Sequence, residues 1–215
     1  WGENVNLDII MENYCTIYLV RHGETEWNVE NRMQGHLDSA LTENGIKQIE
    51  GTANKLKDIK FDAIFSSDLS RTQKTAEIIK LDRDILIQTS HLLRERSFGS
   101  FEGVLSEEYR KTVRDKLEEF QKLTEEEQWD FKMADDVETN GALVTRFLIK
   151  IREIALAYPN QNVLIASHGG IIRNFLLKIG YKKRSELRAG DFKNGSYIKF
   201  LSDGVDFVLK EVNNE

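Results

Sequence analysis

Two stretches of the chain place an imidazole directly after a run of residues typical of a β-strand. Arg21 and His22 follow the β-branched and aromatic run Thr16–Val20, and His168 follows the run Asn162–Ala166. Each histidine precedes a glycine, which tolerates the backbone angles of a tight turn. A single histidine in a turn is more often structural than catalytic, but the repeated strand, histidine and glycine pattern favours a function for both.

A third segment carries a further cation. The strand-like run 62–66 leads into a helical segment with Arg71 in its first turn. In open α/β sheets ligands bind beyond the carboxyl ends of the strands, so we expect the three segments to meet at one crevice. Arginines, histidines and the free N–H groups of helix N-termini suit a tetrahedral oxyanion. The residues therefore predict a phosphate pocket. Metal binding by the histidines is the competing interpretation, which the adjacent arginines disfavour because they repel a divalent cation.

The elements that must position these side chains alternate between strand-like and helical patterns. This alternation favours an α/β fold, a three-layer α/β/α sandwich with a central, mostly parallel sheet flanked by helices. The expected strands are 16–20, 62–66, 84–88, 162–166, 197–201 and 206–210. The expected helices lie within 41–58, 68–80, 142–158 and 169–180, the third ending before Pro159.

One long connection interrupts the alternation. Residues 106–140 are rich in charge and have helical character. Such runs are usually solvated helix faces, although a long connection in a compact domain can also act as a lid. We therefore expect a helical, lid-like insert near the site.

Length and composition set further bounds. The chain has 215 residues, and we expect one domain over 11–215, with 1–10 as a leader or tag-like extension before Met11. Its net charge of −6 disfavours general nucleic-acid binding, and we find no apolar run long enough to span a bilayer. The lone Cys15 allows no intrachain disulfide, so a cytoplasmic location is expected. No heptad or exposed apolar stripe indicates an oligomer, and a homodimer stays an open alternative.

The segment "LVRHGETEWN" resembles the signature of the histidine phosphatase superfamily, also called the phosphoglycerate mutase-like family. Four later blocks are similar to that family in the same order: "NRMQGHLDSALTENGIKQ", "FSSDLSRTQKTAEII", "LLRERSFGSFEG" and "VLIASHGGIIRNFL". A bare Arg-His-Gly triplet would be weak support. The ordered set covers most of residues 16–180 and is much more specific.

The resemblance implies a role for each matching residue. His22 would be the nucleophile that becomes a phosphohistidine, and Glu95 would donate a proton to the leaving oxygen. The neighbouring arginines should keep the attacking imidazole neutral. The phosphoryl oxygens would be held by Arg21, Arg71, His168 and the helix N-terminus at Gly169, with Asn28, Gln34 and Gly35 as further phosphate or substrate contacts. Without the family match, Glu95 would be read as an exposed carboxylate, and His36 and His91 keep a structural interpretation.

The implied activity is a phosphatase that needs no metal and no cofactor and acts on a small-molecule phosphate ester. Similarity of "LRERSFGSFEG" to fructose bisphosphatase-type members makes sugar phosphates a reasonable substrate class. Gln34, and the absence of an adjacent arginine pair in the insert, favour a phosphatase over a cofactor-dependent phosphoglycerate mutase. A non-catalytic phospholigand-binding protein is the third alternative.

One segment departs from the phosphatase pattern. Asp135 and Asp136 stand where phosphatase members often have glycines, ahead of Glu138 and Thr139. We therefore expect the backbone of this loop to differ from that of phosphatase members with glycines here. A carboxylate in this loop can also disfavour substrates with a second phosphate.

Overall fold

The computed structural model describes residues 13–214, and the predicted leader 1–10 lies outside them. At its centre is a six-stranded sheet with the strand order β3-β2-β4-β1-β5-β6. Its strands are β1 (Cys15–Arg21), β2 (Ala63–Ser66), β3 (Ile87–Thr89), β4 (Asn162–Ser167), β5 (Tyr197–Ser202) and β6 (Phe207–Asn213). Strands β3, β2, β4 and β1 pair in parallel, whereas β5 runs antiparallel to both β1 and β6. The predicted mostly parallel sheet is thus confirmed.

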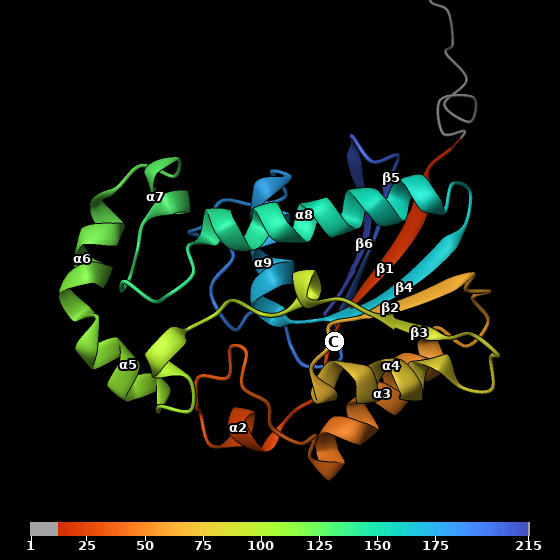
Figure 1. Ribbon diagram of the computed structural model, residues 1–215, viewed down its shortest axis with the longest axis horizontal. Coiled ribbons are helices and arrows are strands. Elements are labelled where there is room, and N and C mark those ends of the chain that lie inside the picture. The colour runs from red at the N-terminus through yellow and green to blue at the C-terminus, as the bar shows by residue number, and fades with distance from the viewer. Residues whose placement is uncertain (1–12, 215) are drawn as a thin grey trace, which may run out of the picture.

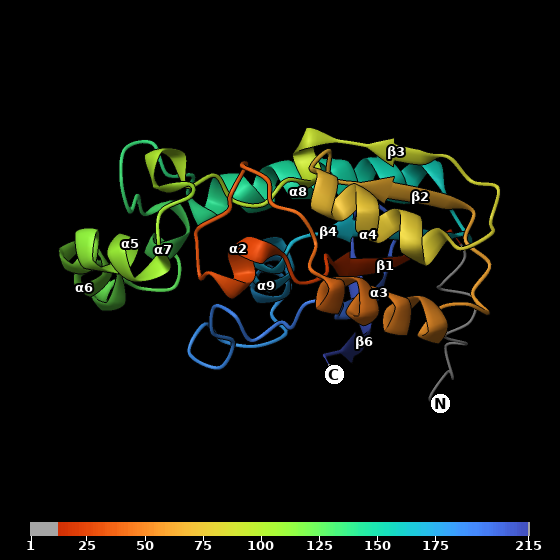
Figure 2. The same cartoon turned by 90° about the horizontal axis from the view of Figure 1, so that it is seen from below.

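Helices cover both faces of the sheet (Figures 1 and 2). Helices α3 (Glu43–Lys55) and α4 (Ser70–Lys80) pack on one face, and α8 (Asn140–Ala157) and α9 (Gly169–Lys178) on the other. Alternate residues of β1 serve the two layers: Ile17 and Leu19 join the core beneath α8 and α9, and Tyr18 and Val20 join the opposite core. The three-layer α/β/α architecture is therefore confirmed.

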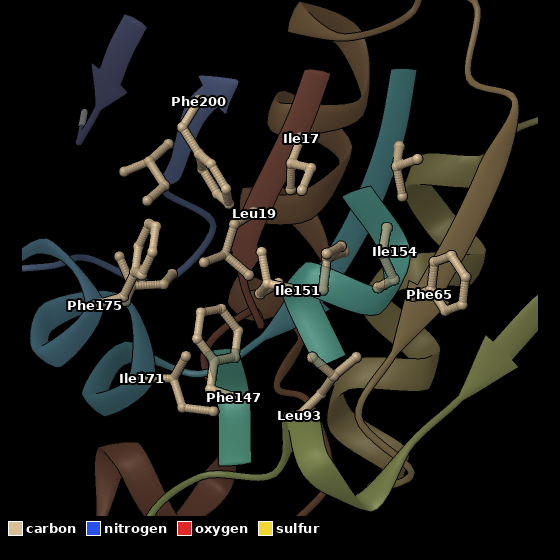
Figure 3. Packing of buried hydrophobic residues seen from close by; sticks show 14 of the residues in the cluster. Ile17, Leu19, Phe65, Leu93, Phe147, Ile151, Ile154, Ile171, Phe175 and Phe200 are labelled. Atoms are coloured by element: carbon tan, nitrogen blue, oxygen red, sulfur yellow. The ribbon is translucent and has the colours of Figure 1, made fainter. Parts of the chain in front are cut away.

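The larger core lies between the sheet and helices α8 and α9 (Figure 3). Phe147 of α8, Phe175 of α9 and Phe200 of β5 are fully buried, and the ring of Phe175 lies 5.6 Å and 4.8 Å from the other two ring centroids. Burying one such side chain contributes about 1.5–3 kcal/mol to folding. This packing fixes the strands whose ends carry the predicted site.

Strand β3 begins later than predicted. The sequence suggested residues 84–88, but pairing with β2 starts at Ile87, which lies opposite Ile64. The preceding residues form a local turn in which the Ile85 N–H bonds to the Arg83 carbonyl. The Arg83 guanidinium also donates to the carbonyls of Leu56, Lys57 and Ile59, which holds this turn against the end of α3.

The predicted helical insert extends to one side of the sheet in both views (Figures 1 and 2). It comprises α5 (Ser106–Thr112), α6 (Arg114–Lys122) and α7 (Glu127–Asp130). Three short elements went unpredicted: α2 (Glu26–Val29) and the 3-10 helices η1 (His91–Leu93) and η2 (Gly99–Phe101). None of the helices within 13–214 combines the length and apolarity that a bilayer crossing requires.

Candidate active site

The register of the sheet brings the two predicted histidines together. Strands β1 and β4 are parallel, with Arg21 opposite Ser167, and the His22 N–H donates to the Ser167 carbonyl at 3.0 Å. The next residue of each strand is therefore a histidine at the same edge of the sheet. The ring centroids of His22 and His168 are 5.3 Å apart. The convergence expected from the strand ends is what the structure shows.

A cavity of about 330 Å³ opens at this edge. The predicted site residues that line it are Arg21, His22, Asn28, Gln34, Gly35, Arg71, Glu95 and Gly169. His168 is not among the lining residues and is fully buried in contact with the His22 ring. Asp135 and Asp136 line a separate cavity with His36 and His91, and Asp136 accepts the Ser100 N–H at 2.7 Å. These carboxylates therefore lie outside the cavity that His22 lines, which removes the structural basis for expecting them to disfavour a second phosphate.

His22 presents one free ring nitrogen. Its Nδ1 lies 2.7 Å from the Gly23 carbonyl oxygen, which can only accept a hydrogen bond, so Nδ1 carries the proton. Nε2 then carries the lone pair. Burial lowers the pKa of His22 well below its ordinary value, and the nearby charges of Arg71 and Arg21 lower it further. The imidazole is thus held neutral, in the tautomer that suits nucleophilic attack through Nε2.

Arg71 is the most deeply buried cation of the site, with 1% of its surface exposed. Its Nη1 donates to the Leu37 carbonyl at 2.7 Å and to Asp38 Oδ1 at 3.0 Å, and its Nη2 donates to the Gly35 carbonyl at 2.8 Å. Gly35 has a φ of +55°, a left-handed conformation that favours glycine. The loop around Gly35 therefore fixes the plane of the guanidinium.

Several buried polar atoms of the site have no hydrogen-bond partner among residues 13–214. They are Arg21 Nε, Arg71 Nε, both ring nitrogens of His168 and Gln34 Oε1. Buried polar groups in folded proteins are nearly always paired, so unpaired polar atoms from separate strands and helices, at or directly behind one cavity, call for an explanation. A bound oxyanion would satisfy the arginine and histidine donors together.

Arg21 lies against the start of α9. Its Nη1 donates to the Phe192 carbonyl. A Cβ atom placed at Gly169 would lie 3.0 Å from Arg21 Nε, so a glycine at this position allows the guanidinium to approach the helix N-terminus closely. The arginine and the first N–H groups of α9 thereby face one region of space.

Glu95 reaches the same region from the segment between η1 and η2. Its Oε2 accepts the Gly170 N–H, and its Oε1 accepts the Arg96 N–H, both at 2.8 Å. The backbone carbonyl of Glu95 accepts from Arg146 Nη2 at 2.7 Å and bonds to His36 Nε2 at 2.9 Å. His36 is therefore structural, as predicted, and it helps to hold the position of Glu95.

Asn28 connects the first loop to the last part of the chain. Its Oδ1 accepts from the Thr25 N–H at 3.1 Å and from Asn194 Nδ2 at 3.2 Å, and Asn194 Nδ2 also donates to the His22 carbonyl at 3.1 Å. Because Oδ1 is occupied, the amide Nδ2 is the group that Asn28 offers to a ligand.

Sequence reasoning missed five arginines of this region, one of which is Arg32, a lining residue that pairs with Glu30. Arg96, Arg173 and Arg188 line the cavity, and Arg146 bonds to Glu138 and to three carbonyls of the Glu95 segment. Arg173 had a detectable signal, because it lies four residues after Gly169 on a predicted helix and so shares its face. Arg188 lies in a long loop, where periodicity carries no information.

No group of three or more His, Cys, Asp or Glu side chains within residues 13–214 is arranged to hold a metal ion. The described site is instead built from arginines, histidines and one carboxylate. That set can hold a tetrahedral anion, supply a neutral imidazole nucleophile and move a proton at Glu95.

Comparisons with known proteins agree with this arrangement. Residues 17–215 match the family model described as histidine phosphatase superfamily (branch 1). A Bacillus subtilis protein named uncharacterized phosphatase PhoE is 33% identical over 163 residues, 76% of each chain. An Arabidopsis thaliana metal-independent phosphoserine phosphatase is 32% identical over 83% of this chain and 73% of its own. The crystal structure of a Bacillus anthracis phosphoglycerate mutase superposes with a TM-score of 0.83 at 27% identity, covering 94% of each chain. The chain belongs to the histidine phosphatase superfamily.

Proposed function

We propose that this protein is a metal-independent phosphatase that hydrolyses small phosphomonoesters through a phosphohistidine on His22. The observation that carries the proposal is the set of unpaired buried donors on Arg21, Arg71 and His168, gathered around a neutral imidazole. The names of the relatives support it, since they include several phosphatases. A sugar phosphate or similar metabolite is the proposed substrate class.

In the first step, Nε2 of His22 attacks the phosphorus atom as the ester P–O bond breaks. Arg21, Arg71 and His168 hold the phosphoryl oxygens and stabilise their charge in the in-line transition state. Glu95 enters this step protonated and gives its proton to the leaving oxygen, so the product leaves as an alcohol. Asn28, Gln34, Gly35 and the Gly169 N–H are proposed as further contacts to the phosphate or substrate.

In the second step, the ionised Glu95 takes a proton from a water molecule. The resulting hydroxide attacks phosphorus, the P–N bond to His22 breaks, and inorganic phosphate leaves. The imidazole returns to its starting tautomer because Nδ1 keeps its proton and donates it in a hydrogen bond to the Gly23 carbonyl throughout. The insert α5–α7 is proposed as a lid over this cavity, to which Ser106 contributes.

A phosphoglycerate mutase is the second candidate, favoured by the structural similarity to the Bacillus anthracis enzyme. In that case a second hydroxyl group, not water, takes the phosphoryl group from His22. A non-catalytic phospholigand-binding protein would need neither the free Nε2 nor Glu95.

The test is release of inorganic phosphate from a panel of phosphomonoesters in EDTA, with His22→Ala as the control. Release by the wild type alone supports the phosphatase. Isomerisation of a phosphoglycerate after bisphosphate priming, without phosphate release, would assign the mutase instead. No activity in either assay would favour the non-catalytic phospholigand-binding protein. Glu95→Gln should slow alkyl esters more than p-nitrophenyl phosphate, whose leaving group needs little protonation, and equal slowing would refute its role as acid.

A further inference from the structure

Four arginines line the cavity without an acidic partner at ion-pair distance within the described chain: Arg21, which belongs to the phosphoryl site, and Arg96, Arg173 and Arg188. The other lining arginines differ, because Arg32 pairs with Glu30 and Arg71 with Asp38. Glu95 is the one acidic side chain among the described residues that line the cavity. The cavity therefore carries a positive charge greater than one phosphoryl group needs.

Arg173 extends this charge along α9. It lies four residues after Gly169, so its Cβ is about 5–6 Å from the start of the helix, on the same face. Its Nε donates to the Leu187 carbonyl at 2.8 Å, whereas its two terminal nitrogens donate to no residue within 13–214. The side chain is thus fixed at Nε with its terminal donors free.

Arg96 is held at a second wall. Its Nη1 donates to Asn140 Oδ1 at 2.9 Å, and its guanidinium carbon lies 5.3 Å from the centroid of the Phe98 ring. Its Nε is buried and has no partner in the described part of the chain. Arg188, which is exposed, comes from the loop after α9. Donors from three separate segments therefore face one cavity.

These arginines lie close enough for their positive charges to repel one another. Burial, together with the charges of Arg184 and Arg96 and against the opposite effect of Asp191, lowers the pKa of Arg173 to about 10. Arg184 stacks over the Trp129 ring of the insert, at 5.1 Å. At neutral pH Arg173 stays protonated, so the cluster retains repulsion that an anion would relieve.

We propose that the substrate carries a second anionic group, a phosphate or a carboxylate, which binds Arg96, Arg173 and Arg188. The proposal rests on the proposed function for the identity of the first group, the phosphoryl group at His22. The backbone of Arg173 lies about one helical turn, ~5.4 Å, beyond the start of α9 at the phosphoryl site. With a cavity of about 330 Å³, this spacing favours a short carbon skeleton between the two anions.

The experiment compares substrates that differ in the second group alone. One pair is 3-phosphoglycerate and glycerol 3-phosphate, and the other is fructose 1,6-bisphosphate and fructose 6-phosphate. In the wild type, kcat/KM should be at least about tenfold higher for the two-anion member of one or both pairs. The first pair tests a carboxylate, and the second tests a phosphate. Equal values within both pairs would overturn the proposal.

Substitutions test whether Arg96, Arg173 and Arg188 cause the preference for substrates with two anionic groups. Arg173→Met should reduce the two-anion preference by about tenfold, whereas Arg173→Lys should keep part of it because the charge remains. Arg152→Gln is the matched control, since it also removes one charge but lies on the exposed face of α8, away from this cavity. Circular dichroism checks that each variant is folded. An unchanged preference in a folded Arg173→Met would refute the subsite.

A binding measurement separates this proposal from the proposed function. In His22→Ala, calorimetry should show tighter binding of 3-phosphoglycerate than of glycerol 3-phosphate, or of the bisphosphate than of the monophosphate. We expect this difference in affinity even if the wild type hydrolyses no ester. Absence of hydrolysis would refute the proposed phosphatase activity and leave the second anion subsite standing. Equal affinities within both pairs would refute the second anion subsite while leaving hydrolysis untouched.

Discussion

Arg146 does not line the cavity, but its removal should disturb the position of Glu95. Its guanidinium forms a paired contact with Glu138, at 2.7 Å and 2.9 Å, and donates to the carbonyls of Leu92, Arg94 and Glu95 at 2.6–2.9 Å. The side chains of Arg146 and Glu138 are 17% and 15% exposed. One mostly buried side chain thus joins α8 to the segment that carries the proposed acid.

Replacing Arg146 with methionine keeps the length of the side chain but leaves Glu138 without its partner. Breaking a buried ion pair in this way costs about 3–5 kcal/mol, and the residual exposure of this pair places the expected loss at about 2–4 kcal/mol. Urea unfolding followed by circular dichroism measures the loss. Lys74→Met is the control, because the Lys74–Glu77 pair is more than half exposed and should contribute less than about 0.5 kcal/mol.

The same variant should have a selective effect on activity. Without Arg146, the backbone of Glu95 loses one of its two side-chain contacts, so the carboxylate is less precisely placed. A misplacement of about 1 Å can cost about a hundredfold in rate, and the loss should fall on alkyl esters more than on p-nitrophenyl phosphate. A change of less than about 1 kcal/mol in the unfolding free energy, or equal slowing of both substrates, would refute this reasoning.

Three further predictions concern two buried side chains and one exposed glycine. Because the pKa of His22 is lowered in the folded state, the unfolded chain binds a proton below about pH 6.5 that the folded chain does not, so stability falls as the pH drops from 7 to 5. His22→Asn should reduce the slope of unfolding free energy against pH by up to about 1.4 kcal/mol per pH unit. An unchanged slope would contradict this prediction. Gly51→Ala should stabilise the protein by about 0.5–1 kcal/mol in urea unfolding, since Gly51 lies exposed inside α3 with open space around it, and destabilisation would show a hidden contact. Burial, reinforced by Asp62, raises the pKa of Cys15 to about 12, so the folded protein should not react with a thiol reagent that labels the unfolded chain; rapid labelling of the native state would refute this.

The chemistry at the strand ends could be predicted because the information is local. A strand pattern, a histidine and a glycine in sequence are sufficient to place His22 and His168 at the edge of a sheet, and parallel register then brings them together. Arg71 followed from its position in the first turn of a predicted helix. The outer helices were predicted for the same reason, since their apolar spacing is a property of adjacent residues.

The rest of the site depends on contacts between distant segments. The clamp of Arg146 on Glu138 and on the Glu95 segment spans 8 and 51 residues of sequence, and no local pattern signals it. Arg188 lies in an irregular loop, and Arg96 is one charge in an alternating run that looks like a solvated surface. The late start of β3 likewise results from contacts that Arg83 makes with the end of α3.

The proposed function depends on covalent phosphorylation of His22 at Nε2. The most direct measurement is rapid acid-free quenching of a reaction with ³²P-labelled phosphomonoester, followed by peptide mapping under alkaline conditions, where phosphohistidine survives. We expect one labelled peptide containing His22, loss of that label in acid, and no label in His22→Ala. A label on another residue, or turnover that persists in His22→Ala, would contradict it.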